Sequence, residues 1–280
     1  MRRVMKLIRN LLMAAVTGLA FVPAIANANI LVSPTRVVLE DGERASELVF
    51  LNRSDEESAF RISLENRRML SDGSMEKVET AIDGELFAKE FLRYSPRRVV
   101  LSGGEQQTIR ISSRLPRDIA PGEYRSHLRI MAVPVSAGNS LQSIASDDDS
   151  DALSITLVAI QSVTIPVILR VGDLDASIEI DALSIEQGEE ETETYLVAKM
   201  SRAGNRSPYG DIKIYAAGES EPVYFARGIA VYVPTDTRDV FLPLPESVKE
   251  KIAGRNVRIV YDSSDPQKPG ILAEHATRLP

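Results

Sequence analysis

Short segments rich in Val, Ile and Leu recur along almost the whole chain, and Gly, Asp, Asn or Pro separates each segment from the next. Short strands at regular spacing, with turn residues between them, are typical of a β-sandwich. In the first half, the predicted strands lie within residues 30–40, 46–54, 58–70, 97–115, 123–135 and 153–169. Residues 97–115 are predicted to form two strands around the turn Gly103-Gly104. We therefore predict an all-β chain.

The second half repeats this pattern after a very short linker at residues 170–175. Its predicted strands lie within residues 176–187, 193–204, 209–218, 222–234, 237–245, 256–264 and 271–279. About 250 residues follow the N-terminal segment, which suits two domains of roughly a hundred residues each. The chain has no cysteine, so each domain needs a hydrophobic core without a disulfide. We predict domains at 29–170 and 171–280, with a cleft between them.

Helical character is confined to three short stretches. Residues 84–95, GELFAKEFLRYS, could form a helix, and residues 115–124 and 245–254 could form a helical turn each. These stretches are too brief to change the predicted all-β class.

The N-terminus has the pattern of a secretory signal peptide. Its basic residues are Arg2, Arg3, Lys6 and Arg9. An apolar run from Leu11 to Val22 follows, and Ala26-Asn27-Ala28 matches an A-x-A cleavage site. Because the apolar run is too short to span a bilayer, we predict a signal peptide at residues 1–28, cleaved after Ala28. An uncleaved amphipathic anchor is the alternative.

Charge and residue types argue against several functions. The chain carries 33 Lys and Arg against 40 Asp and Glu, a net charge of −7, whereas nucleic-acid binding needs a basic surface. The two histidines, His127 and His275, have no metal-ligand spacing, and we expect His127 on the surface. No nucleophile–base motif is visible. We therefore predict no catalytic residue, no metal, no cofactor and no small-molecule substrate.

Residues 135–152 form a long polar segment between two predicted strands. Long loops of this kind are usually functional or disordered. The acidic residues Asp147, Asp148, Asp149 and Asp151 lack the turn glycine and the distal Glu of a calcium loop. We therefore predict a solvated acidic loop.

The apolar strand at residues 153–169 has an unusual middle, because it is apolar on both faces. One face carries Leu153, Ile155, Leu157 and Ala159, and the other carries Val158 and Ile160 between polar residues. Such a strand is either buried on both sides, or one face is exposed until another molecule covers it. We expect the first set to face outward and Val158 and Ile160 to face the core.

Four features together resemble the periplasmic pilus-assembly chaperones, which have two immunoglobulin-like domains. The first is ILVSPTRVVLEDG at the predicted mature N-terminus. The second is the block Ser95–Ile111, which resembles the family's Pro-x-x-hydrophobic-x-x-Gly-x-x-Gln-x-hydrophobic-Arg signature. The third is Leu115-Pro116 and the strand ending at Pro134, and the fourth is the long loop with its apolar strand. The resemblance covers most of residues 30–172 and implies two immunoglobulin-like β-sandwich domains.

In this family the apolar strand completes a pilin-like subunit that lacks a strand of its own, which is donor-strand complementation. The resemblance thus implies a donor strand with Leu153, Ile155, Leu157 and Ala159. It also implies pilin-like secreted subunits as partners, an outer-membrane usher as a further partner, and a periplasmic location. A self-assembling structural or adhesive protein is the alternative function, and packing of the same residues on the protein's own core is the alternative role for the strand.

The resemblance also implies an anchor for the subunit's C-terminal carboxylate, formed in the family by an Arg and a Lys. Arg36 matches the family's Arg, whereas alignment on Arg170 places Pro166 where the family has its Lys. We therefore predict that Arg36 holds the carboxylate with help from Arg170. A second departure follows Leu115-Pro116, where IAPGEYRSHL replaces the family's Asp-Arg-Glu-Ser-x-Phe run.

Overall fold

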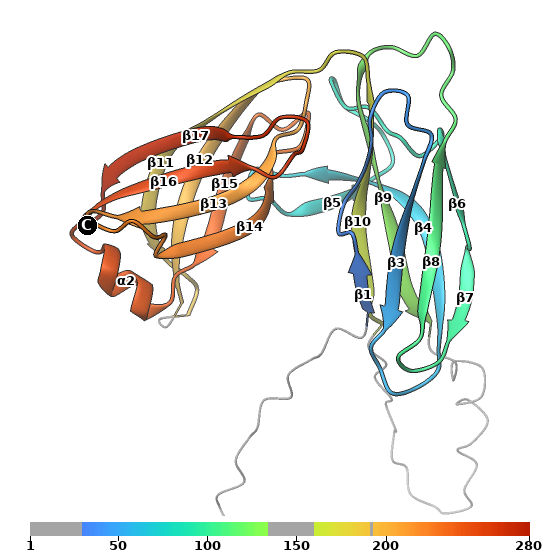
Figure 1. The fold of residues 1–280 in the computed structure, drawn as a ribbon, viewed down its shortest axis with the longest axis horizontal. Helices are drawn as coiled ribbons and strands as arrows, with labels where there is room; N and C mark the ends of the chain where they lie inside the picture. The colour runs from blue at the N-terminus through green and yellow to red at the C-terminus, as the bar shows by residue number, and fades with distance from the viewer. Residues whose placement is uncertain (1–29, 134–159, 191–192) are drawn as a thin grey trace, which may run out of the picture.

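The computed structural model describes residues 30–133, 160–190 and 193–280, and it confirms the all-β class. Two immunoglobulin-like β-sandwich domains are set at an angle to each other and joined by a short linker (Figure 1). The linker between the last strand of the first domain and the first strand of the second consists of residues 172–175.

The first domain is a sandwich of two sheets. Its strands are β1 (Ile30–Ser33), β2 (Val37–Leu39), β3 (Ala45–Asn52), β4 (Ser58–Met69), β5 (Met75–Val78), β6 (Leu92–Ser95), β7 (Arg98–Leu101), β8 (Gln106–Ser113), β9 (Gly122–Val133) and β10 (Ser162–Val171). One sheet has the order β1-β3-β8-β6, and the other has the order β2-β10-β9-β4-β5, with β7 also paired to β4. The chain therefore changes sheets between β1 and β2, and β2 pairs with β10 in parallel.

The two faces of β10 are covered by different parts of the molecule. Ile165, Val167 and Leu169 are buried in the core between the two sheets. Ile168, on the opposite face, is fully buried in a small apolar cluster with Met69 of β4 and two residues of the second domain. This part of the strand is apolar on both faces because the second domain covers the face that the first domain's core leaves open.

The start of the apolar strand differs from our expectation. Ile160 precedes β10 and is 59% exposed, so the prediction that it faces the core is wrong. The odd-numbered residues of β10 are the ones that face the core, and a shift of one residue exchanges the faces. Val158 and the four predicted donor residues, Leu153, Ile155, Leu157 and Ala159, lie outside the described residues, as does most of the acidic loop.

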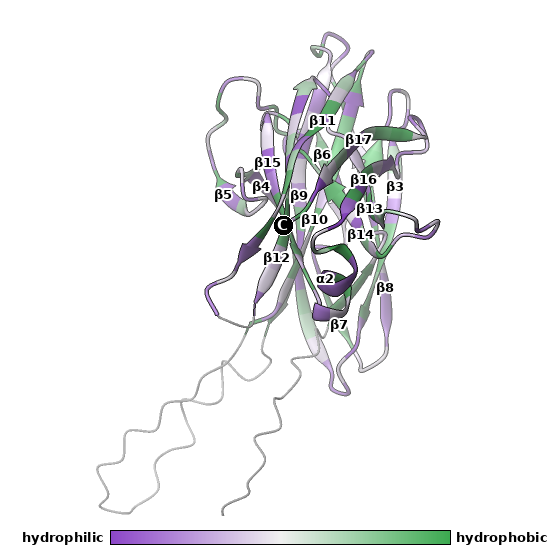
Figure 2. Cartoon of the chain, turned by 90° about the vertical axis from the view of Figure 1, so that its left-hand side faces the viewer, coloured by the Kyte–Doolittle hydropathy of each residue, from purple (hydrophilic) through white to green (hydrophobic). Residues whose placement is uncertain are grey.

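The second domain is also a sandwich of two sheets. Its elements are β11 (Ala176–Gln187), β12 (Thr194–Gly204), β13 (Tyr209–Ala216), β14 (Tyr224–Ala230), β15 (Thr237–Pro243), α2 (Glu246–Ile252), β16 (Asn256–Ser263) and β17 (Ile271–Arg278). The sheets have the orders β11-β12-β15 and β14-β13-β16-β17. In both domains, green apolar and purple polar residues alternate along the strands (Figure 2), as expected when one face of each sheet is buried.

The three stretches with helical character have different outcomes. Residues 245–254 contain α2, as predicted. Residues 84–95 form turns and then β6, because Leu92 pairs with Ser113 of β8 and is buried in the core. Residues 115–124 form a turn and the start of β9. Pairing with a neighbouring strand outweighed local helix propensity in residues 84–95. Within the described residues, no helix is long and apolar enough to cross a membrane.

A hairpin links the two domains a second time, away from the linker. The turn between β4 and β5 reaches the second domain, where the backbone N–H of Asp239 donates to Ser71 O at 2.6 Å. The hydroxyl of Thr235 donates to Met69 O at 2.8 Å. Gly73 in this turn has φ +81°, and a Cβ there would lie 2.6 Å from Nε of Arg238. A side chain at this position would be strained by the positive φ and would displace the guanidinium of Arg238.

Candidate functional site at the domain interface

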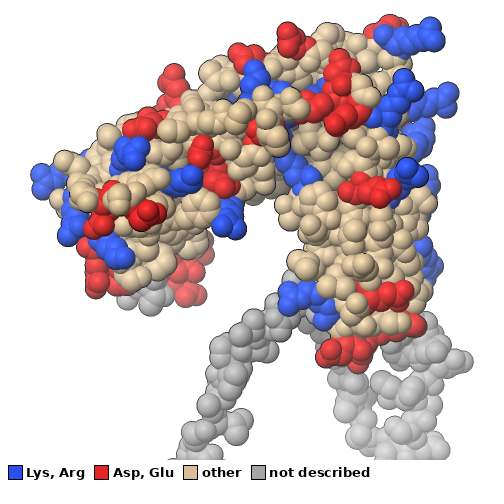
Figure 3. Space-filling view, in the orientation of Figure 1, with Lys and Arg blue, Asp and Glu red and all other residues tan. Residues whose placement is uncertain are grey.

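The side of the first domain's sheet that faces the second domain carries polar residues from two neighbouring strands. Along β9 and β10, the paired positions are Glu123 with Arg170, Arg125 with Ile168, and His127 with Pro166. Alternation along each strand places these residues on one face, which we call the cleft face. The second domain covers this face, so its polar side chains are buried (Figure 3 shows the hollow between the two domains).

His127 illustrates the effect of this cover. It is 3% exposed, so the prediction of a surface residue is wrong. Burial, together with the positive charges of Arg125 and Arg67, lowers the pKa of His127 to about 3. The alternation of Arg125, His127 and Arg129 has the pattern of a solvent-facing strand, and only the second domain makes it an interior surface.

Arg170 lies at the centre of an ion-pair cluster at the linker end of the interface. The hinge cluster consists of Glu40, Glu123, Arg170, Arg206 and Asp265. Nη1 of Arg170 lies 2.7 Å from Oε1 of Glu40 and 2.9 Å from Oδ2 of Asp265, and its Nε lies 3.1 Å from Oε2 of Glu123. The side chain is 2% exposed, so three carboxylates surround a buried guanidinium.

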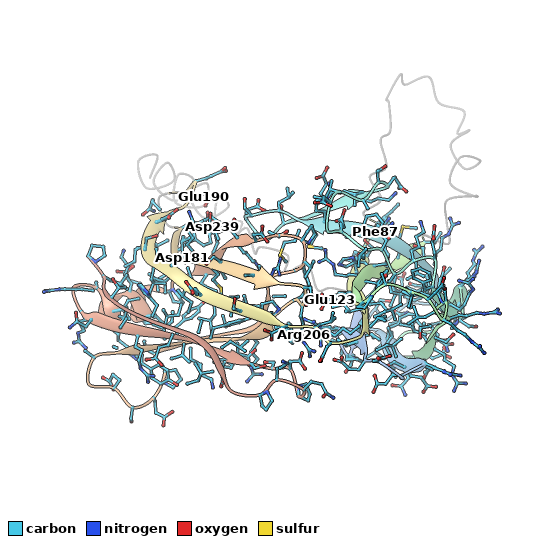
Figure 4. The ribbon with its side chains drawn as sticks, turned by 90° about the horizontal axis from the view of Figure 1, so that it is seen from above. Phe87, Glu123, Asp181, Glu190, Arg206 and Asp239 are labelled. Carbon is cyan, nitrogen blue, oxygen red and sulfur yellow. The ribbon has the colours of Figure 1, made fainter. Side chains whose placement is uncertain are left out.

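The hinge cluster connects the two domains directly. Glu123 of the first domain accepts hydrogen bonds from the hydroxyl of Ser207 and, at 3.1 Å, from its backbone N–H. Burial raises the pKa of Asp265, but hydrogen bonds from Arg206, the Gln267 backbone and Arg170 outweigh it and lower this pKa to about 2. Figure 4 shows Glu123 and Arg206 close to the junction of the domains. Asp265 therefore stays ionised at neutral pH, and the charge of Arg170 is already matched.

Arg36 lies in a cleft between the domains and has different surroundings. Its guanidinium stacks on Tyr209, with Cζ 4.5 Å from the ring centroid, and on Tyr232 at 5.7 Å. Its Nη1 is buried without a hydrogen-bond partner among the described residues. The cleft has a volume of about 380 Å³, and Arg36 and Arg170 both line it. The structure thus brings the two predicted anchor residues together, but Arg170 is bound by the protein's own carboxylates.

Two further arginines lie near Tyr232 and were missed by the sequence analysis. Cζ of Arg125 lies 4.2 Å from the ring centroid of Tyr232, and burial lowers the pKa of Arg125. Burial also lowers the pKa of Arg238, which comes from β15 of the second domain. The sequence holds no local signal for this group, because more than a hundred residues separate Arg125 from Arg238.

Comparison with known proteins shows similarity only at the level of structure. No family model matches the sequence, and no curated protein matches it. Similar solved structures include the class 5 fimbriae chaperone CfaA, with a TM-score of 0.43 and 15% identity over 89% of this chain and 99% of that chain. The complex of CsuC with the tip adhesion subunit CsuE from Acinetobacter baumannii has a TM-score of 0.46 and 10% identity over 90% and 98% of the two chains. The chaperone DraB from E. coli has a TM-score of 0.41 and 13% identity over 89% and 96%.

Proposed function

We propose that this protein is a non-enzymatic periplasmic chaperone that binds, caps and delivers pilin-like subunits by donor-strand complementation. The observation that carries the proposal is the alternation along β10. Ile165, Val167 and Leu169 face the core, and the same odd-numbered row continues upstream in the sequence as Leu153, Ile155, Leu157 and Ala159. A strand that extends this row beyond the sandwich would carry apolar side chains from its own core into that of a partner.

This arrangement supplies both affinity and specificity. Backbone hydrogen bonds along the added strand provide affinity, and alternate side chains fill pockets in the partner. Burial of three side chains of the size of Leu or Ile contributes about 1.5–3 kcal/mol each before ordering costs are subtracted. Under this proposal the row faces away from solvent only in the complex, whereas Ile160 on the opposite face is exposed.

Arg36 is the proposed anchor for the C-terminal carboxylate of the subunit. It lies in the cleft between the domains and has a nitrogen without a hydrogen-bond partner. A charge-assisted hydrogen bond to a carboxylate is worth about 1.5–3 kcal/mol. Arg170 lines the same cleft but is bound by Glu40, Glu123 and Asp265, so we assign it to holding the domains together.

The proposal includes export to the periplasm and an outer-membrane usher as a second partner. Export is supported by the signal-peptide pattern of residues 1–28, which lie outside the described residues. N-terminal sequencing of the exported protein should find Asn29 as the first residue. An intact Met1 on exported protein would contradict this part of the proposal.

Leu157→Glu tests the donor strand. This change should abolish capture of a purified pilin-like subunit, because a charge would be buried without a partner. The free protein should stay folded, which circular dichroism can check. Ile160→Asp is the matched control: since Ile160 is 59% exposed, this change should alter stability by no more than about 0.5 kcal/mol and leave capture intact.

Two results would contradict the chaperone role. Equal capture by Leu157→Glu and the wild type would remove the strand from the binding surface. Polymers of the purified wild-type protein alone, seen by analytical ultracentrifugation and lost in Leu157→Glu, would instead support a self-assembling structural protein.

A further inference from the structure

The described part of the interface contains buried nitrogens without a hydrogen-bond partner. The buried side-chain polar atoms without a partner among the described residues all belong to basic side chains: Arg36 Nη1, Arg125 Nη1, His127 Nδ1, Arg129 Nε and Arg238 Nε. A buried polar atom left unpaired costs about 1–3 kcal/mol. A surface with this composition favours a ligand that brings acceptors and negative charge.

Two of the residues that carry these nitrogens line one cavity. His127 Nδ1 and Arg238 Nε belong to residues around a space of about 300 Å³ between the cleft face and the second domain. We call it the His127 pocket. Its remaining lining residues are Arg67, Met69, Met75, Thr164, Pro166, Gly228, Ala230 and Tyr232. It shares no lining residue with the cleft that contains Arg36, so it is a separate site.

The acidic side chain across the strands from His127 already forms ion pairs. Glu65, which pairs across the strands with His127, has Oε1 2.6 Å from Nε of Arg67 and Oε2 4.0 Å from Nη1 of Arg129. Arg125 stacks on Tyr232 and donates to the backbone carbonyls of Arg67 and Val233. The lowered pKa of His127 agrees with this positive surrounding, because nearby cations oppose protonation of the imidazole.

Arg238 is held in place from both domains. Its Nη1 donates to Ala230 O, and its guanidinium packs closely over Gly73 of the β4–β5 turn. His127 is fixed by its position in the middle of β9, paired with β4 on one side and β10 on the other. The two nitrogens therefore belong to rigid elements of different domains, which is the arrangement of a preorganised binding site.

We propose that the His127 pocket binds a small oxyanion, which accepts hydrogen bonds from Arg238 Nε and a ring nitrogen of His127. Phosphate and carboxylate share the required chemistry, namely a negative charge on oxygen atoms that accept hydrogen bonds. Because the ligand contacts both domains, it stabilises their relative orientation by mass action in the folded state. This proposal does not depend on the chaperone role.

The mature full-length protein is titrated with inorganic phosphate and, separately, with acetate at constant ionic strength and pH 7. One of these anions should raise the melting temperature in a saturable way. Its dissociation constant should match the one obtained from the shift of the His127 imidazole resonances in NMR spectra. The anion that saturates at the lower concentration identifies the ligand as a phosphate or a carboxylate.

Arg238→Gln should weaken binding by tenfold or more, because a neutral amide replaces the charged donor. Arg258→Gln is the matched control: Arg258 lies in the same domain and its side chain is 46% exposed. It pairs with Glu274 at 3.4 Å and stacks on Tyr215, and neither residue lines the His127 pocket, so affinity should not change. If Arg238→Gln does not fold, His127→Phe serves as the second variant and should also weaken binding. Absence of a saturable shift with both anions, or equal affinities in Arg238→Gln and Arg258→Gln, would overturn the proposal.

Discussion

Two groups of arginines lie at the interface between the domains, and they differ in what surrounds them. In the hinge cluster, Arg170 contacts three carboxylates and connects both domains. Arg36, Arg125 and Arg238 instead lie around Tyr232 and keep nitrogens without hydrogen-bond partners. The two groups thus contain the same residue type in a similar position and differ in the acceptors available to it.

This difference separates a structural role from a binding role. A buried ion pair whose partners are complete fixes geometry, because loss of any member leaves an uncompensated charge. A cation that keeps a buried nitrogen without a hydrogen-bond partner weakens the free protein slightly and gains energy only when a ligand arrives. The hinge cluster therefore sets the angle between the domains, and the group around Tyr232 is available to bind anions.

Arg170→Met should cause the largest loss of stability. It leaves Glu123, 1% exposed, without its guanidinium, and breaking a buried pair costs about 3–5 kcal/mol. Urea unfolding measures the free energy of unfolding. Arg258→Met is the control, because its exposed pair with Glu274 should contribute less than about 1 kcal/mol. A loss below 1 kcal/mol for Arg170→Met would mean that the hinge cluster does not hold the domains.

His127 should make the protein less stable as the pH falls from 7 to 5. The unfolded chain takes up a proton near pH 6.5, whereas the folded protein does so only near pH 3, so the unfolded state binds more protons in between. The loss is at most about 1.4 kcal/mol per pH unit, or about 2 kcal/mol between pH 6.5 and pH 5.

His127→Phe should lack this pH dependence, which urea unfolding at several pH values can show. Asp265 should not interfere, because its pKa is lowered to about 2 and its contribution is lost only below its ordinary value of 3.8. Glu65, the cross-strand partner of His127, is unchanged in both proteins. Identical slopes for wild type and His127→Phe would show that His127 is protonated in the folded state at these pH values.

Arg36→Met should have the smallest effect on stability, about 1 kcal/mol, because it removes the stacking on Tyr209 but leaves no acceptor without its partner. The same change should weaken capture of a pilin-like subunit by roughly tenfold or more, which corresponds to about 1.4 kcal/mol. Titration calorimetry and urea unfolding on one preparation separate the two effects. Strong destabilisation with unchanged capture would place Arg36 with Arg170 as a structural residue.

Much of the fold could be predicted from local pattern. The predicted strand at 176–187 coincides with β11, and residues 245–254 contain α2, because alternation and helix propensity are properties of neighbouring residues. The prediction failed where contacts between residues far apart in the chain determine the local structure. Residues 84–95 form turns and β6 because β8 pairs with them. Ile160 lies just before β10 and is exposed instead of facing the core.

The candidate site shows the same limit. Arg36 was predicted as a site residue because its segment resembles the first strand of a known family. The structure places it in a cleft between the domains. Arg125 and Arg238 carried no such signal, since each has the surroundings of an ordinary surface arginine in its own strand. The role of Arg170 in binding a carboxylate stays a prediction. Its contacts with Glu40, Glu123 and Asp265 could not be predicted, because these residues come from three separate segments that meet only in the folded protein.

Local sequence is enough to predict the all-β class and the two-residue alternation of the strands, because both follow from backbone geometry and from the residues next to one another. What covers each face of a sheet depends on how the domains pack. The cleft face of β9 and β10 is polar enough to face water, yet the second domain buries it, so His127 is neutral and the nearby arginines are desolvated. Burial and charge at such a surface depend on contacts between residues far apart in the chain, and no local pattern records them.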